Sequence, residues 1–337
     1  MASESGKLFA FHNSGLFSAY YLSNILKEQE EWKTDVKATF QKINSLYRSQ
    51  KKELPLLNED SLEDNFIQPI LKELGHILEP QPTLPPALEG TKRPDLAIFP
   101  DAASRKAALP HQGKEKFFTM VTAICEVKRW GRPLDKKLQT DADPFEAQNP
   151  SLQISRYLWL SGVKWGILTD GRFWRLYERE SSKRLDVYYE IDLPDLLERG
   201  DVETFKYFAL LFRKEAIPNF LDKVYQGSIT YAKEVGEDLK KNIYEALKVL
   251  AEGFLKNPAN HLGASQLEFV RSQALIYLYR LLFILYAEDR SLLPLDNPQY
   301  HDAYSLRSLR GEIGKKLDSE AEKMKLSPIK YAYWEHL

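Results

Sequence analysis

Cysteine is almost absent from this 337-residue sequence, which contains only Cys125. A single cysteine excludes an internal disulfide and a zinc site built on several thiolates, and it is typical of a reducing cytoplasm. The six histidines are scattered and show no metal-ligand spacing. The net charge is −1, so the chain lacks the basic excess that marks many nucleic-acid-binding proteins. Any site for nucleic acid must therefore be a local patch.

Long hydrophobic runs are also missing. The N-terminus has no basic segment that leads into an apolar core, so we expect no signal peptide. The most apolar run, residues 275–286, is interrupted by Arg280 and is too short to cross a bilayer. With 43% hydrophobic and 28% charged residues, the composition is that of an ordinary globular protein. We expect a soluble, cytoplasmic protein with no membrane partner.

The pattern of apolar residues divides the chain into three predicted domains. Residues 1–52 have helical spacing from residue 7 onward and predict a helical N-terminal segment. Residues 53–194 alternate between helical and strand patterns, which predicts a small mixed α/β domain. Residues 195–337 are helical almost throughout, and the run 281–285 is apolar on every side. We expect the helix that contains this run to lie at the centre of a bundle.

Turn and cap signals place the helices and the hairpin of the central domain. Ser61, with Asp64 three residues later, predicts the start of a helix that ends at Gly75. Pro69 inside this helix is expected to bend it or to shift its start. A second helix is predicted from Pro150 to Gly162. Asp170-Gly171 lies between two strand-like runs and predicts a β-hairpin.

Two strands of the central domain carry the residues of greatest chemical interest. Strands are predicted at 93–99 and 117–128, with an inserted surface loop at 102–116 whose role the sequence does not reveal. Side chains alternate between the faces of a strand, so Glu126 and Lys128 point the same way. Asp95 is a further acid on the preceding strand. Two carboxylates and a strand carbonyl can hold Mg²⁺, which prefers oxygen ligands and keeps several waters.

Mg²⁺ at these carboxylates predicts phosphodiester hydrolysis. The metal lowers the pKa of a bound water and offsets negative charge on phosphorus, while Lys128 can position the water or stabilise the transition state. The alternative is an Asp at a turn and an exposed Glu-Lys ion pair of little energetic value. Glu63 on the preceding helix favours the catalytic interpretation. Gln153 and Tyr157 share one helix face and could support the site, or Tyr157 could be a core residue beside a solvated Gln153.

Basic residues follow the Glu-x-Lys pattern directly. Arg129, Arg132, Lys136 and Lys137 flank or follow Trp130, a combination that suits the DNA backbone. A solvated loop with one buried tryptophan explains the same residues equally well. We therefore treat the four basic residues, with Tyr157, as candidate DNA contacts.

The motifs taken together resemble a known nuclease signature. Glu63, Pro94-Asp95, Glu126-Val127-Lys128 and Gln153-x-x-x-Tyr157 are similar to the PD-(D/E)xK nucleases and to the Gln-x-x-x-Tyr element of their RecB-like branch. Three further stretches resemble the N-terminal half of type IIG restriction enzymes. They are Leu16-Phe17-Ser18-Ala19-Tyr20-Tyr21-Leu22, Ile167-Leu168-Thr169-Asp170-Gly171-Arg172, and the segment 281–294, which contains Tyr286-Ala287-Glu288-Asp289-Arg290.

The resemblance implies a restriction-endonuclease-like fold with a mixed sheet core, flanked by an N-terminal helical segment (1–52) and a C-terminal helical connector (195–337). It implies a type II site-specific deoxyribonuclease that hydrolyses double-stranded DNA with Mg²⁺. Asp95 and Glu126 would be metal ligands, Lys128 would act on the nucleophile, and Glu63 and Gln153 would support the site.

In type IIG enzymes a methyltransferase and a target-recognition domain follow the nuclease and the connector in one chain. No methyltransferase motif is present here, so we expect a piece of a longer restriction-modification polypeptide. The alternative is a catalytically inactive DNA-binding or assembly module that docks a methyltransferase.

Overall fold

The computed structural model describes residues 10–85, 93–137 and 149–318, and all statements below refer to them. The chain forms two compact units, Met1–Glu234 and Val235–Leu337. Both sequence-expected boundaries, at 52/53 and 194/195, fall inside the first unit. The reason is that apolar residues from all three predicted segments, such as Phe40, Ile167 and Phe208, belong to one core.

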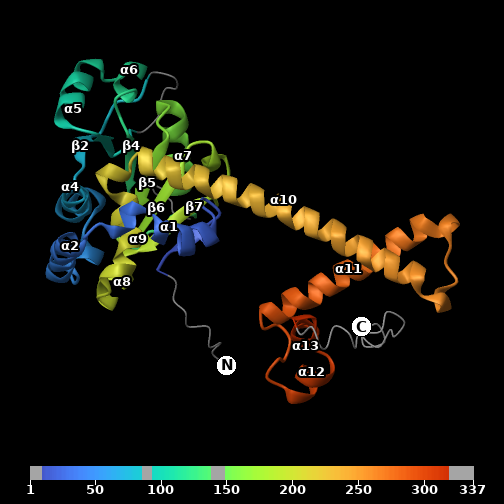
Figure 1. The fold of residues 1–337 in the computed structure, drawn as a ribbon. Helices are drawn as coiled ribbons and strands as arrows, with labels where there is room; N and C mark the ends of the chain where they lie inside the picture. The colour runs from blue at the N-terminus through green and yellow to red at the C-terminus, as the bar shows by residue number, and fades with distance from the viewer. Residues whose placement is uncertain (1–9, 86–92, 138–148, 319–337) are drawn as a thin grey trace. The chain divides into compact units, whose positions relative to one another are not determined.

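The first unit is built on a seven-stranded mixed sheet with the order β1-β7-β6-β5-β4-β3-β2 (Figure 1). Only β4 and β5 run parallel, and every other neighbouring pair is antiparallel. The sequence-based prediction of a mixed α/β fold is therefore confirmed. The strands are β1 (His12–Ser14), β2 (Ile77–Pro80), β3 (Leu96–Phe99), β4 (Ala123–Val127), β5 (Trp165–Thr169), β6 (Phe173–Glu178) and β7 (Tyr188–Asp192).

Helices of the first unit cover both faces of this sheet. A parallel pair needs a crossover connection, which α7 supplies between β4 and β5. The α-helices are α1 (Leu26–Glu28), α2 (Lys37–Gln50), α3 (Glu59–Leu62), α4 (Gln68–Glu73), α5 (Ala102–Ala108), α6 (Glu115–Phe118), α7 (Pro150–Ser161), α8 (Leu193–Arg199), α9 (Val202–Phe212) and α10 (Asn219–Lys256), which begins in the first unit and continues into the second. Short 3₁₀ or π turns, labelled η, are η1 (Tyr21–Ile25), η2 (Glu30–Lys33), η3 (Leu54–Leu56), η4 (Glu63–Ile67), η5 (Leu109–His111), η6 (Ser181–Lys183) and η7 (Lys214–Ala216).

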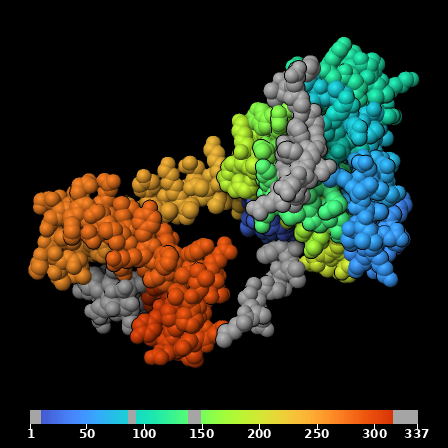
Figure 2. Space-filling model, turned by 180° about the vertical axis from the view of Figure 1, so that it is seen from behind, coloured from blue at the N-terminus to red at the C-terminus, as the bar shows by residue number. Residues whose placement is uncertain are grey.

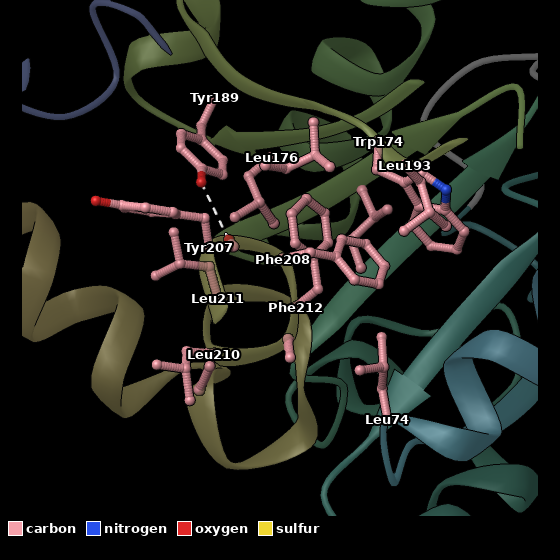
Figure 3. Close-up of a cluster of buried hydrophobic side chains, with 14 of the residues drawn as sticks. Leu74, Trp174, Leu176, Tyr189, Leu193, Tyr207, Phe208, Leu210, Leu211 and Phe212 are labelled. Atoms are coloured by element: carbon pink, nitrogen blue, oxygen red, sulfur yellow. Dashed lines mark hydrogen bonds between the residues drawn. The ribbon is translucent and has the colours of Figure 1, made fainter. Parts of the chain in front are cut away.

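The larger core lies on the face of the sheet that α2, α4, α8 and α9 cover. Figure 3 shows Phe208 and Phe212 of α9 among side chains of β6 and β7. The centroids of the Trp174 and Phe208 rings are 5.4 Å apart. Tyr189 donates a hydrogen bond to the carbonyl oxygen of Tyr207 at 3.0 Å (Figure 3). Because strand side chains alternate, Cys125 belongs to this core while its neighbour Glu126 lies on the opposite face, under α7.

Three local predictions are wrong. Residues 12–14 are not helical but form β1, which pairs with β7 at the sheet edge. The segment 102–116 is not a loop, because Asp101 caps α5 through the backbone N–H of Ser104, and α6 follows. Figure 2 shows this helical insertion, in teal, at the surface of the first unit. Phe117 and Phe118 belong to α6, so the strand predicted from 117 begins only at Ala123.

The helix that precedes the sheet also starts earlier than predicted. Asn58, rather than Ser61, is the N-cap, and its side chain accepts a hydrogen bond from the backbone N–H of Ser61 at 2.8 Å. A π turn at Glu63–Ile67 then separates α3 from α4. Pro69 has no N–H to donate and its ring opposes a regular helical turn, which accounts for the interruption. The earlier start places Glu59 in the first helical turn.

Protonation of His76 is expected to weaken the first unit at low pH. Burial lowers the pKa of His76 to about 4, and its Nε2 lies 2.7 Å from the carbonyl oxygen of Phe212. Between pH 6.5 and 4 the unfolded chain binds more protons than the native one, so the free energy of unfolding falls as the pH falls through this window. His76 should contribute roughly 3 kcal/mol to that fall.

Denaturant unfolding at pH 6.5 and at pH 4 gives the fall in unfolding free energy for the wild type and for His76→Gln. The difference between these two falls is the contribution of His76. His12→Gln is the control, because His12 is an exposed histidine of the same unit. Equal pH dependence in the wild type and His76→Gln would show that His76 does not contribute.

The second unit is helical. Leu250 of α10 packs against Ala274 and Leu278 of α11, with Phe254 and Tyr277 beside them. Its elements after α10 are η8 (Pro258–Asn260), η9 (Ala264–Gln266), α11 (Leu267–Asp289), α12 (Pro298–Ala303) and α13 (Leu306–Asp318).

The prediction that the run 281–285 lies at the centre of a bundle is wrong for the described residues. Phe283 and Tyr279 are each 71% exposed, and α11 lies at the surface of the second unit, in orange in Figure 2. The segment Ala264–Asp289 is long and apolar enough to span a membrane, by length and composition only. Only 17% of its most apolar window is buried, and one such helix is by itself weak evidence for a membrane span.

Glu288 holds α13 in place and should be important for the stability of the second unit. Its buried carboxylate accepts hydrogen bonds from the backbone N–H groups of Leu306 and Arg307, at 2.9 and 2.8 Å, and from the hydroxyl of Tyr300 at 3.0 Å. Glu288→Ala leaves these donors without an acceptor, so we expect a loss of about 2–4 kcal/mol in unfolding free energy. Exposed Asp289→Ala is the matched control, and the two variants should differ in thermal unfolding. If they unfold alike, the cap does not stabilise this unit.

Candidate functional site

The site begins with two acids that the sheet register places opposite each other. Leu96 of β3 pairs with Cys125 of β4, so Asp95 and Glu126, one residue beyond this pair, are cross-strand neighbours. Both lie on the face that α7 covers. Side chains at such positions have Cβ atoms about 5 Å apart, close enough for their carboxylates to share one cation.

Asp95 is fixed at the end of the β3–β4 ladder. Its Oδ2 accepts a hydrogen bond from the backbone N–H of Val127 at 2.7 Å. Burial raises the pKa of Asp95 to about 6, although the Lys128 ammonium opposes this shift. Burial also raises the pKa of Glu126, and the charge of Asp95 adds to the effect. The two carboxyls therefore favour a shared proton or a cation.

Lys128 supplies a positive charge to this pair. Its Nζ donates to Glu126 Oε1 at 2.5 Å and to the Val127 carbonyl oxygen at 2.7 Å, and the side chain is only 9% exposed. Burial by itself would lower the pKa of Lys128, but the charges of Glu126, Asp95 and Glu59 outweigh it and raise the pKa. The prediction that Glu126 and Lys128 share one face is confirmed, and the lysine is a permanent cation here.

Glu59 is the site residue that the sequence analysis missed. Its Oε1 accepts from Lys128 Nζ at 3.3 Å and its Oε2 accepts from the backbone N–H of Arg129 at 3.2 Å. The misplaced helix start concealed it, because Glu59 was expected to precede the cap. Recognising Asn58, a strong N-cap type followed by two acids, would have placed Glu59 in the helix.

Glu63 lies near the acids but contacts a different partner. Its Oε1 accepts a hydrogen bond from Gln68 Nε2 at 3.0 Å. Burial raises the pKa of Glu63 to about 7, and the negative charge of Asp95 contributes. Glu63 is thus close enough to sense the site electrostatically, whereas Glu59 contacts the lysine directly.

Gln153 and Tyr157 of α7 face the acid pair. Gln153 donates to the Tyr157 hydroxyl at 3.0 Å, and both residues are buried. Burial raises the pKa of Tyr157, and the charge of Glu126 adds to this effect. The expectation that Tyr157 contacts DNA is corrected, because a side chain that is 2% exposed offers no surface to a duplex.

The basic segment 129–137 leaves β4 directly beside the site. Arg129, Lys136 and Lys137 are exposed, and Arg132 is partly exposed. The hairpin anchors the start of this segment, since Asp170 Oδ2 accepts from the backbone N–H of Gly131 at 3.1 Å. Trp130 packs over Gly171, where a Cβ atom would lie 3.0 Å from the indole ring. The sequence expectation of a basic surface next to Glu126 therefore remains consistent with this arrangement.

The donor set fits one small, hard cation with few protein ligands. Within the described ranges, no three carboxylate, histidine or cysteine groups surround one point. Mg²⁺ does not require three, because it keeps several waters and is commonly held by one or two carboxylates. Glu126 Oε2 is buried, and no donor among the described residues reaches it. A buried acceptor oxygen that receives no hydrogen bond and lies beside a second carboxyl is suited to binding a cation.

No model of a known protein family, no curated protein and no solved structure gave a significant match to this chain.

Proposed function

We propose that the first unit is a Mg²⁺-dependent nuclease module that hydrolyses DNA phosphodiester bonds. The observation that carries the proposal is the convergence of Asp95, Glu126 and Lys128 at the end of two neighbouring strands. Glu126 Oε2 there has no donor within the described residues, and Lys128 pairs with Oε1 at 2.5 Å. Two buried acids with one lysine form a combination that binds a divalent cation beside a positive charge.

The proposed chemistry assigns each residue a separate task. Asp95 and Glu126, with the Val127 carbonyl, would hold Mg²⁺, which when bound activates water and offsets negative charge on phosphorus. Lys128 would orient the attacking water and stabilise the charge that develops on the phosphoryl oxygens. Gln153, which donates a hydrogen bond to the Tyr157 hydroxyl, would support the site from α7. Glu63 would adjust the charge of the cluster from the neighbouring helix.

The order of elements supports the same family-level proposal. Helix α4 is followed by three strands that pair antiparallel, β2, β3 and β4, then by crossover helix α7 and the parallel strand β5. This succession is similar to that of PD-(D/E)xK nucleases, with the acid pair at the carboxyl end of β4. We propose a restriction-endonuclease-like core in a cytoplasmic restriction-modification polypeptide. The second unit would connect it to methyltransferase and target-recognition domains in the same chain.

A cleavage assay tests this function. The protein is incubated with plasmid DNA in Mg²⁺ and, separately, in EDTA, and the products are separated by electrophoresis. We expect nicked or linear DNA only with Mg²⁺. Cleavage that is equal in EDTA, or that survives neutralisation of both Asp95 and Glu126, would contradict the proposal.

Two observations favour a second candidate, a catalytically inactive DNA-binding or assembly module. Lys128 already pairs with Glu126 Oε1. In addition, α11 presents exposed apolar residues that could dock a methyltransferase. Calorimetric titration with Mg²⁺ separates the candidates, since an inactive module should give no heat that depends on Asp95 and Glu126.

A further inference from the structure

The Lys128 ammonium and the backbone N–H of Arg129 are held by one carboxylate, that of Glu59. The two oxygens of this carboxylate accept one hydrogen bond each, from Lys128 Nζ at 3.3 Å and from Arg129 N at 3.2 Å. A cation and an N–H group spaced to engage both oxygens of one anion form an oxyanion site. A phosphodiester presents the same pattern with its two non-bridging oxygens.

The contacts of Lys128 are unequal. Its Nζ lies 2.5 Å from Glu126 and 2.7 Å from the Val127 carbonyl oxygen, but 3.3 Å from Glu59. An ammonium has three protons, so the longest contact is the one that another acceptor can replace while the other two persist.

Glu59 is also the exposed member of this group. Its side chain is 44% exposed, compared with 9% for Lys128. Exposed ion pairs contribute little to stability, so releasing Glu59 into water costs the fold little. The carboxylate therefore marks an anion position that solvent, and with it a phosphate group, can reach.

We propose that Lys128 Nζ and the Arg129 N–H bind a phosphate oxyanion, and that Glu59 fills this position in the free protein and competes with the substrate. The identity of the ligand, a phosphodiester of DNA, rests on the proposed function. Glu59 is then a self-inhibitory residue rather than a catalytic one. Its removal should strengthen phosphate binding.

The test compares Glu59→Gln with Asp60→Asn in metal-free buffer. Both substitutions remove one negative charge from the first turn of α3, but Asp60 is an exposed neighbour, and it is Glu59 that accepts the hydrogen bonds from Lys128 and Arg129. Inorganic phosphate is titrated, and the Arg129 amide resonance is followed by NMR. Glu59→Gln should bind phosphate about fivefold more tightly than the wild type, whereas Asp60→Asn should change affinity less than twofold. Glu59→Ala should behave as Glu59→Gln, and circular dichroism checks that each variant is folded.

Equal phosphate affinity in Glu59→Gln and Asp60→Asn would overturn the proposal, because general charge removal would then explain any effect. Weaker Mg²⁺ binding by Glu59→Gln, with unchanged phosphate affinity, would overturn it too and make Glu59 a metal ligand. A short DNA duplex in EDTA forms the second arm and should bind Glu59→Gln more tightly by a similar factor. Tighter phosphate binding without tighter duplex binding would contradict the DNA assignment.

Failure of the proposed function gives a different result. In that case the wild type would not cleave DNA in Mg²⁺, yet Glu59→Gln would still bind inorganic phosphate more tightly than Asp60→Asn.

Discussion

Replacing Lys128 with alanine should abolish Mg²⁺-dependent DNA cleavage, with a rate loss of about 10³-fold or more. Lys128 is the only basic side chain in hydrogen-bonding contact with Glu126 among the described residues, at 2.5 Å. Its charge is maintained at all relevant pH values because the neighbouring acids raise its pKa. Single-turnover cleavage of a DNA fragment measures the rate.

The fold should survive the loss of Lys128. Breaking a buried ion pair can cost several kcal/mol, but Glu126 can take up a proton once the lysine is gone, since burial already raises its pKa. Lys128→Met retains most of the apolar stem and should be as inactive as Lys128→Ala while remaining closer to wild-type stability. Lys116→Ala removes an exposed lysine charge from α6, away from the residues assigned to the site, and should keep the wild-type rate. Cleavage at the wild-type rate by either Lys128 variant would refute its assigned role.

Replacing Asp95 with asparagine should weaken Mg²⁺ binding by about 100-fold. The amide oxygen of asparagine can still accept the hydrogen bond from Val127 N–H, which Asp95 accepts at 2.7 Å, so the strand end should keep its geometry. What disappears is one of the two negative charges that would hold the ion. Calorimetric titration with Mg²⁺ gives the dissociation constant directly, without reference to activity.

Asp101→Asn is the matched control for this substitution. Asp101 is an exposed acid that follows the same strand, β3, and asparagine can replace it as the N-cap of α5. Its Mg²⁺ affinity should equal that of the wild type. Identical dissociation constants for Asp95→Asn and Asp101→Asn would remove Asp95 from the metal site.

Short-range patterns predicted the central elements of the fold well. Pro150 and Gly162 bound α7 as expected, and Asp170-Gly171 forms the turn between β5 and β6. Alternation along β4 correctly placed Glu126 and Lys128 on one face. These features depend on backbone conformations and periodicities that a few adjacent residues determine.

Features that depend on partners distant in sequence were harder to predict. β1 is a strand only because β7 pairs with it, and three residues carry too weak a pattern to reveal this. The segment 281–285 looks like a buried helix by composition, but burial depends on what packs around it. Glu59 joined the site through Lys128 and Arg129, about seventy positions away. No periodicity connects residues over such a distance.

The second unit gives one sequence motif a structural explanation. Tyr286-Ala287-Glu288-Asp289-Arg290 contributed to the resemblance, and the structure shows Glu288 as the acceptor that organises α12 and α13. A motif whose glutamate accepts hydrogen bonds from neighbouring helices indicates a role in folding rather than in catalysis. The catalytic proposal therefore depends on the residues of the first unit alone.

Asp95 and Glu126 are proposed to hold one divalent ion next to Lys128. Anomalous diffraction from crystals soaked in Mn²⁺, which replaces Mg²⁺ and scatters strongly, tests this proposal most directly. We predict one anomalous peak about 2.1 Å from oxygens of both carboxylates, with the Lys128 ammonium within reach of the same position. No peak between Asp95 and Glu126 at saturating Mn²⁺, with Lys128 still paired to Glu126, would contradict the account.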